Sequence, residues 1–221
     1  MKKVIIAVIF LSMAAAVYSQ TGIIREITGE VELKTAGSAV FIRAQNGNEV
    51  AQDTIISTGF RSTAVVVIGS SSITIQPLTR LALSEIQSSA GIENLNVNLQ
   101  AGRIRVDVNP PAGTKVNTTV QSPSATASVR GTSYEMDIYN LNVIEGTVNF
   151  VGSDNVPVSV TGGSSTSVTT SGSAQDPILL SSIDVLPPLP PGAGASGEIL
   201  SVNNIQPPFS AGTLSIILIW Q

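Results

Sequence analysis

Apolar and polar residues alternate with period two through most of the chain, the pattern of half-buried β-strands. In one such segment, Leu95, Val97 and Leu99 alternate with three asparagines, which predicts one dry face and one face lined with amides. The run 64–68 is apolar throughout and predicts a central strand buried on both faces. Because these segments are short and recur about every ten residues, they predict an all-β sandwich or jelly-roll-like domain of antiparallel strands.

The alternation changes phase within 123–150. Apolar positions are odd-numbered from Ala125 to Val129 and even-numbered from Tyr134 to Ile138. An unbroken strand cannot do this, because its side chains point to opposite faces in strict turn. We therefore expect a β-bulge near Arg130-Gly131-Thr132.

The following strand changes phase in the same way. Leu141 and Val143 are odd-numbered and Val148 and Phe150 even-numbered, with Glu145-Gly146 between them. The two segments together predict a kinked hairpin that turns at Tyr139-Asn140 and has its two kinks close together.

Three motifs resemble the FecR domain of bacterial envelope proteins. They are L-Q-A-G-R-I at 99–104, S-P-S-A-T-A-S-V-R-G-T-S-Y at 122–134 and V-I-E-G-T-V at 143–148. The likeness covers roughly residues 28 to 170, although Gln52 stands where the family usually has a glycine before Asp53. The resemblance implies a non-catalytic envelope module that binds a protein or ligand in a sensory or scaffolding role. Family members that regulate sigma factors carry a cytoplasmic domain and a transmembrane helix before this module. Neither is recognised in this sequence, which argues against direct control of a sigma factor.

The candidate partner-binding residues are Arg130, Gly131, Thr132, Glu145 and Gly146. The predicted hairpin places Glu145 opposite Tyr134 and near Arg130. These two charges are either recognition charges for a partner or a structural ion pair that satisfies backbone groups exposed at the kinks, and we favour the ion pair.

The N-terminal residues 1–19 have the pattern of a secretory signal peptide. Lys2 and Lys3 precede an apolar run at 4–16 that is short for a membrane span, and cleavage is expected after Ser19. The chain has no cysteine, which excludes lipid attachment at an N-terminal cysteine as well as disulfides. These features predict a periplasmic or extracellular protein without a membrane span after cleavage.

Composition narrows the function. Only 12% of the residues are charged, the net charge is -4, and 4% are aromatic, which argues against a nucleic-acid partner. With neither histidine nor cysteine, the chain has no His-based triad, thiol nucleophile or usual zinc site. Glu135 and Asp137 share a strand face as a conceivable hydrolytic dyad, but a solvated face is the favoured interpretation. We predict no enzyme activity, cofactor or metal.

The C-terminal part departs from the strand pattern. The β domain is expected to span 20–175, with 162–173 as either an edge strand or a linker. A Pro/Gly-rich linker at 176–212 follows, and a terminal β-strand at 213–221 carries Leu214, Ile216, Leu218 and Trp220. We expect this strand to pair with an open sheet edge of its own domain. The alternative is an edge of another envelope protein or of a second copy.

Three functions remain open at the level of sequence. The first is the envelope module implied by the FecR resemblance. The second is a structural component that assembles through its C-terminal strand, and the third is a cell-wall carbohydrate binder that uses the asparagine face.

Overall fold

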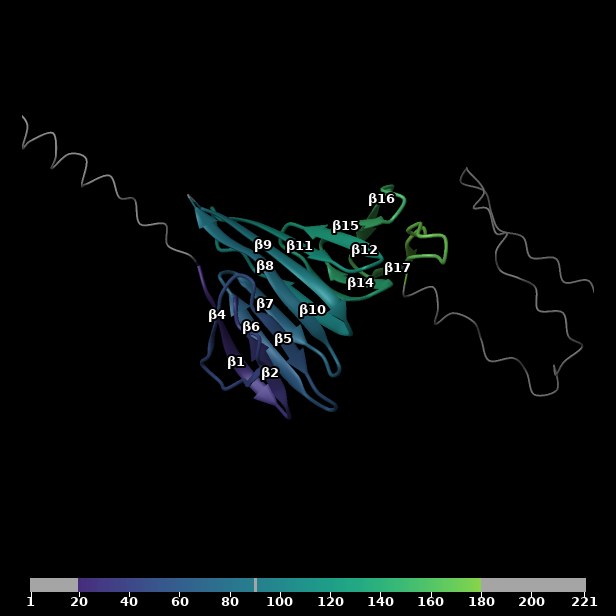
Figure 1. Ribbon diagram of the computed structural model, residues 1–221. Coiled ribbons are helices and arrows are strands. Elements are labelled where there is room, and N and C mark those ends of the chain that lie inside the picture. Colours follow the sequence, from purple (N-terminus) through teal and green to yellow (C-terminus); the bar gives the residue numbers. More distant parts are fainter. Residues whose placement is uncertain (1–19, 90, 180–221) are drawn as a thin grey trace, which may run out of the picture. The chain divides into compact units, whose positions relative to one another are not determined.

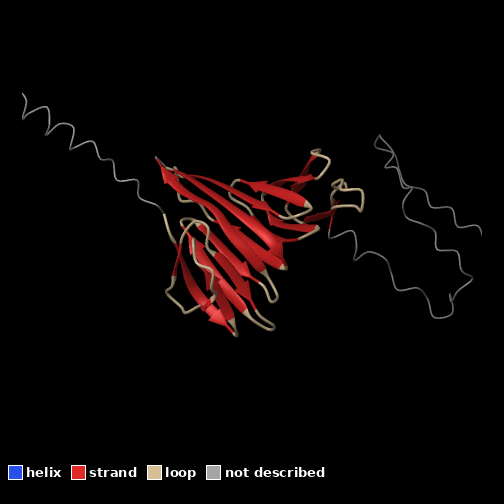
Figure 2. Cartoon of the chain, in the orientation of Figure 1, coloured by secondary structure: helices blue, strands red, loops and turns tan. Residues whose placement is uncertain are grey.

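The computed structural model describes residues 20–89 and 91–179, and all regular elements in this part of the chain are β-strands (Figure 2). No helix among these residues is long and apolar enough to cross a membrane. The all-β fold predicted from the alternation is confirmed.

The strands form two nine-stranded sheets. Sheet A has the order β18 (Ile178–Leu179), β17 (Ser164–Ser167), β14 (Asn140–Glu145), β13 (Ser133–Asp137), β10 (Arg103–Val108), β7 (Ser71–Ile75), β6 (Thr63–Ile68), β1 (Gly22–Thr28) and β4 (Glu49–Val50). Sheet B has the order β16 (Pro157–Thr161), β15 (Thr147–Gly152), β12 (Ala125–Val129), β11 (Lys115–Gln121), β9 (Ile92–Ala101), β8 (Arg80–Ser89), β5 (Ile55–Thr58), β2 (Val31–Lys34) and β3 (Ile42–Arg43).

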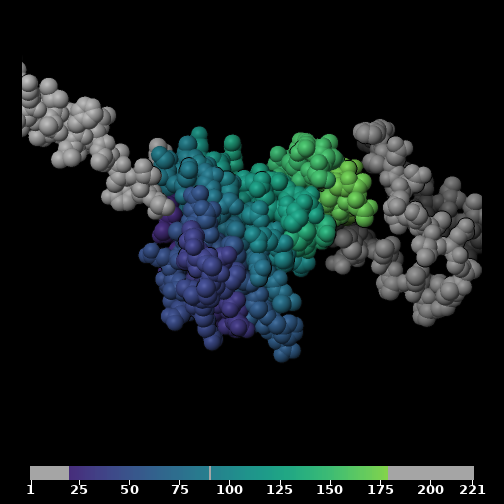
Figure 3. Space-filling model, viewed as in Figure 1, coloured from purple at the N-terminus to yellow at the C-terminus, as the bar shows by residue number. Residues whose placement is uncertain are grey.

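The chain builds both sheets together as it advances. Hairpins such as β6–β7 in sheet A and β8–β9 in sheet B follow one another in alternation, so the sequence colours progress across the two sheets (Figures 1 and 3). Strands β9 and β11 pair in parallel, and the other pairs in the described residues are antiparallel. The parallel pair arises because β10 lies in sheet A, between two strands of sheet B along the chain.

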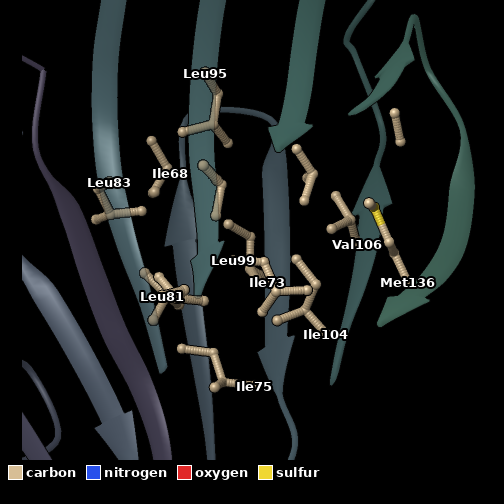
Figure 4. Packing of buried hydrophobic residues seen from close by; sticks show 14 of the residues in the cluster. Ile68, Ile73, Ile75, Leu81, Leu83, Leu95, Leu99, Ile104, Val106 and Met136 are labelled. Atoms are coloured by element: carbon tan, nitrogen blue, oxygen red, sulfur yellow. The ribbon is translucent and has the colours of Figure 1, made fainter. Parts of the chain in front are cut away.

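One hydrophobic core lies between the sheets. Ile73 and Ile104 of sheet A and Leu81 and Leu99 of sheet B are fully buried and lie close together (Figure 4). The core is made mainly of valine, isoleucine and leucine, whose branched side chains suit pleated, half-buried strands. The period-two pattern therefore predicted which face of most strands is buried.

Strand β6 is buried on one face only, whereas the sequence predicted burial on both faces. It occupies a central position in sheet A, as predicted, but Val65 and Val67 are only half-buried, whereas Ala64, Val66 and Ile68 are buried. The outer face of sheet A is not covered by another layer of described residues, so this apolar run is fully buried on one face only.

The glycine- and serine-rich stretch after Thr161 contains a strand. Residues 164–167 form β17, which pairs with β14, and β18 then pairs with β17 beyond residue 175, where the sequence placed the domain end. The C-terminal strand residues Leu214, Ile216, Leu218 and Trp220, the linker after 179 and the signal peptide lie outside the described residues.

Candidate functional site

Residues 130–132 and Gly146 form two corners at which the chain passes between the sheets. β12 lies in sheet B and β13 in sheet A, while β14 lies in sheet A and β15 in sheet B. At each corner the last buried residue of one strand and the first of the next are an odd number of positions apart, three from Val129 to Thr132 and five from Val143 to Val148, so the phase of the buried positions changes there. The expected bulge at Arg130-Gly131-Thr132 is therefore wrong, and a corner explains the change of phase.

The two corners lie side by side, as the sequence predicted. Gly131 and Gly146 have φ angles of 67° and 86°, which glycine adopts at little cost. A Cβ atom built on Gly146 would lie 3.2 Å from the Gly131 carbonyl oxygen and 2.9 Å from Thr132 Oγ1. Both the backbone conformation and the close approach thus favour glycine at 146.

The predicted hairpin between the corners is present with a shifted register. Met136 pairs with Leu141 on either side of the turn, whereas Glu145 pairs with Ser133 rather than with Tyr134. The register slips between Ser133 and Tyr134 because Ile144 has no opposite residue. A bulge does exist in this hairpin, but it lies in β14 and not at Arg130.

The predicted ion pair between Arg130 and Glu145 is not among the salt bridges of the described residues, and both side chains are exposed. Polar groups at the corners are satisfied by other means. The buried Thr132 donates from Oγ1 to the Thr147 carbonyl at 3.2 Å, and the Gly146 carbonyl accepts from the Gly162 amide at 2.9 Å. The corners therefore hold together through a threonine and the backbone, which leaves Arg130 accessible.

Two open hollows border Arg130 and Gly131. One, of about 580 Å³, extends over the outer face of sheet B to Asn149, and the other, of about 470 Å³, extends to Ile92 and Lys115. Asn117 lines both hollows. We call this region the corner surface and define it by Ile92, Lys115, Asn117, Arg130, Gly131, Gly146 and Asn149.

The corner surface combines charge, amides and one apolar side chain. Lys115 and Arg130 supply positive charge, and Ile92 is 41% exposed. Asn117 Nδ2 donates to Asn94 Oδ1 at 2.9 Å, which fixes the orientation of that amide. This combination is suited to an acidic group set beside a small apolar contact.

The amide-lined face of β9 is confirmed: Leu95, Val97 and Leu99 are buried, and the asparagines between them are half-buried on the outer face of sheet B. Part of their bonding capacity is used within the sheet, since Asn94 accepts from Asn117 and Asn96 donates to Glu85.

Glu135 and Asp137 both lie on the outer face of sheet A, where each faces an arginine. Asp137 accepts from Arg103 at 2.9 Å, and Glu135 lies 3.8 Å from Arg105. Partial burial favours a higher pKa for Asp137, but hydrogen bonds from the Tyr139 amide, Arg103 and Asn140 together hold its pKa below the ordinary value. Asp137 therefore stays ionised at neutral pH as an acceptor.

The arginine network was not predicted from the sequence. The period-two spacing of charges at 103–107 and at 135–137 was visible, but their contact depends on β10 pairing with β13. A hollow of about 270 Å³ lies beside Asp137 and Asn142. Among the described residues, no group of three or more His, Cys, Asp or Glu side chains is placed to hold a metal ion.

Comparison with known proteins identifies one family. The model of the family described as "FecR protein" matches residues 53–149, which include both corners and the L-Q-A-G-R-I motif. None of the curated proteins matches the sequence.

Among solved structures, two crystal structures of a candidate anti-sigma factor from Parabacteroides distasonis are similar, with a TM-score of 0.45 and 16% sequence identity. The similarity covers 55% of this chain and 57% of that protein, so the chain spans little more than half the length of the structure it matches. The match of the family model to residues 53–149 confirms the FecR resemblance expected from the motifs.

Proposed function

We propose that the protein is a non-catalytic component of the bacterial cell envelope whose FecR-like domain binds another protein in sensing or scaffolding. The observation that carries the proposal is the FecR match, which spans both corners. The accessible Arg130 between two hollows supplies a surface on which such binding can take place.

The corner surface fits a protein partner that presents an acidic side chain. Arginine is enriched at protein interfaces because its planar guanidinium forms bidentate bonds with carboxylates and also packs against apolar groups. Arg130 is free of an ion pair among the described residues, and Lys115 lines the same hollow. A partner carboxylate bound here would therefore not displace an existing internal partner.

Site-specific photo-crosslinking in cells that naturally produce the protein tests this proposal. A photoreactive residue at Asn149, which is exposed beside one hollow, is expected to give a defined adduct with one envelope protein. The same residue at Thr28, exposed on β1 of sheet A, is the control. The yield of this adduct should fall in the Arg130→Glu variant. The proposal would be contradicted if both positions gave the same adduct, or if Arg130→Glu left the yield unchanged.

Export is part of the same proposal. If residues 1–19 are a cleaved signal peptide, the mature protein from the cell envelope begins at or next to Gln20. N-terminal sequencing checks this, and a mature protein that still begins with Met1 would refute it.

Carbohydrate binding is the second candidate, and the outer face of β9 favours it because Asn98 forms no side-chain hydrogen bond with the described residues. Binding of the purified protein to cell-wall material that is lost in the Asn98→Ala variant would support this function over the first. Assembly through the C-terminal strand at 213–221 stays a prediction.

A further inference from the structure

The two sheets of the described residues end in four open edges, and one of them differs from the rest. β3, β4 and β18 are two residues long, whereas β16 spans Pro157–Thr161. Outside the strand ladders, none of the backbone hydrogen bonds of the described residues reaches these five positions. β16 is therefore the longest of the four strands that end the two sheets (Figure 1).

The backbone groups that point outward from β16 follow from its pairing with β15. Along an antiparallel strand, the N–H and C=O groups of successive residues point alternately toward opposite sides. The Gly162 amide, just after β16, donates to the carbonyl of Gly146, just before β15, so the residues of β16 with even numbers face β15. Ser159 and Thr161 therefore direct their N–H and C=O groups toward the open side.

The β16 edge lacks the features that usually prevent strand edges from associating. Natural edges are shortened, charged or interrupted by proline. β3 and β4 are short and carry Arg43 and Glu49, whereas β16 contains no charged residue. Its only protective feature is Pro157 at the first position, where the missing N–H would lie on the open side.

Apolar surface accompanies this edge. Val156, just before β16, is 57% exposed, and Val158 packs against the core while remaining half-exposed. An added strand would cover Val158 and extend the core beyond Val160.

We propose that two copies of this chain associate by pairing β16 with β16 of the second copy, antiparallel and about a two-fold axis at Val160. In this register Ser159 faces Thr161 of the other copy, so all four outward backbone groups of these two residues are paired. Pro157 lies outside the paired stretch, opposite Gly163. A two-fold contact brings identical surfaces together, and the neutral β16 does so without like-charge repulsion.

The pairing makes one continuous sheet from the two B sheets, with both cores on the same side. This follows because antiparallel neighbours in a sheet are related by a two-fold axis perpendicular to it, which keeps the same face inward. The proposal is independent of the function proposed above, since β16 carries none of the residues that define the corner surface.

Cysteine cross-linking tests the register, and the natural chain contains no cysteine that could interfere. Facing residues of an antiparallel pair lie within the Cα separation of about 4.4–6.8 Å that a disulfide requires. A mixture of the Ser159→Cys and Thr161→Cys variants, carrying tags of different size, is expected to form mixed disulfide dimers faster than either variant alone. Ser88→Cys, which is exposed on β8 and not on β16, mixed with either variant is the control.

A charge placed on the edge tests the association itself. Thr161 is exposed and outside the core, so Thr161→Lys should leave folding intact while abolishing the dimer, and Ser88→Lys should leave the dimer unchanged. Sedimentation velocity gives the mass, and circular dichroism checks the fold. A monomeric natural protein at its highest soluble concentration, or mixed disulfides no faster than the Ser88→Cys control, would overturn the proposal; both are expected if the chain's own C-terminal segment or another protein covers the edge.

Discussion

The hydroxyl oxygens of Tyr134 and Thr118 are buried in the core without a hydrogen-bond partner among the described residues. Tyr134 is fully buried on β13, and its ring is among the largest side chains in the core. A buried polar group without a partner costs about 1–3 kcal/mol, so the ring stabilises the fold while its hydroxyl opposes it.

Tyr134→Phe should therefore raise the melting temperature, because it removes the hydroxyl and keeps the ring. The expected gain is on the order of 1 kcal/mol in the free energy of unfolding. Tyr139→Phe, at a position that is 57% exposed, is the control and should change little. A destabilised Tyr134→Phe variant would show that the hydroxyl has a partner in solution.

The same residue predicts a loss of stability at alkaline pH. Burial raises the pKa of Tyr134 well above its ordinary value, so the folded protein keeps a proton that the unfolded chain releases near pH 10. Stability is unaffected by this group below about pH 10 and falls as the pH rises further, because the unfolded state then binds fewer protons. Denaturant titrations between neutral and alkaline pH should show a smaller loss for Tyr134→Phe than for the natural protein.

The two corner glycines offer a matched pair of substitutions. Alanine at either position is strained by the positive φ, but only at Gly146 would the new Cβ also press on Thr132 and the Gly131 carbonyl. At Gly131 the nearest atom would be Pro110 Cγ at 3.5 Å, an ordinary contact. We expect Gly131→Ala to cost about 1 kcal/mol and Gly146→Ala about 2–3 kcal/mol by thermal unfolding. Equal losses would mean that strain alone decides.

At the scale of elements, strand pairing decides which charges matter. The ion pair expected between Arg130 and Glu145 would make Arg130→Ala more destabilising than Arg103→Ala. In the structure, Arg103 of β10 instead pairs with Asp137 of β13, whose side chain is only 16% exposed.

The expected order is thus reversed, and Arg103→Ala should lower the melting temperature more than Arg130→Ala. The loss should stay below about 1 kcal/mol, because the Arg103 side chain is itself 58% exposed and solvent weakens the pair. Differential scanning calorimetry of the two variants decides the point. A larger loss for Arg130→Ala would instead favour the predicted ion pair at the corners.

At the scale of the whole described domain, one core that both sheets share holds the strands together. Val31 of β2 and Val160 of β16 lie near opposite ends of sheet B, yet both belong to the same buried cluster. Because no boundary divides this core, the described β domain should unfold as one cooperative unit.

Val31→Ala and Val160→Ala should therefore each shift a single unfolding transition to lower temperature. The expected cost is about 1–3 kcal/mol for each, from lost burial and the cavity that remains. Fluorescence and circular dichroism followed in parallel check this. Two separate transitions, each sensitive to one variant, would show that the ends unfold independently.

Most strands, their buried faces and the two places where the phase changes were readable from the sequence, because alternation is a local property of the chain; that each phase change is a corner between the sheets was not. The turn at 52–53 was locally encoded as well. The left-handed conformation falls on Asp53, whose φ is 64°, so position 52 does not require a glycine and can hold Gln52.

Tertiary structure decided which strands are neighbours and everything that depends on it. The sequence does not record that β9 pairs in parallel with β11, that Arg103 meets Asp137, or that β16 is left at an edge. These contacts join residues far apart in the chain, and several pairings would bury the same alternating faces equally well. Only the packing of all the hairpins around one core selects among them, which is why the scaffold of the candidate site was predictable while its charge pairing was not.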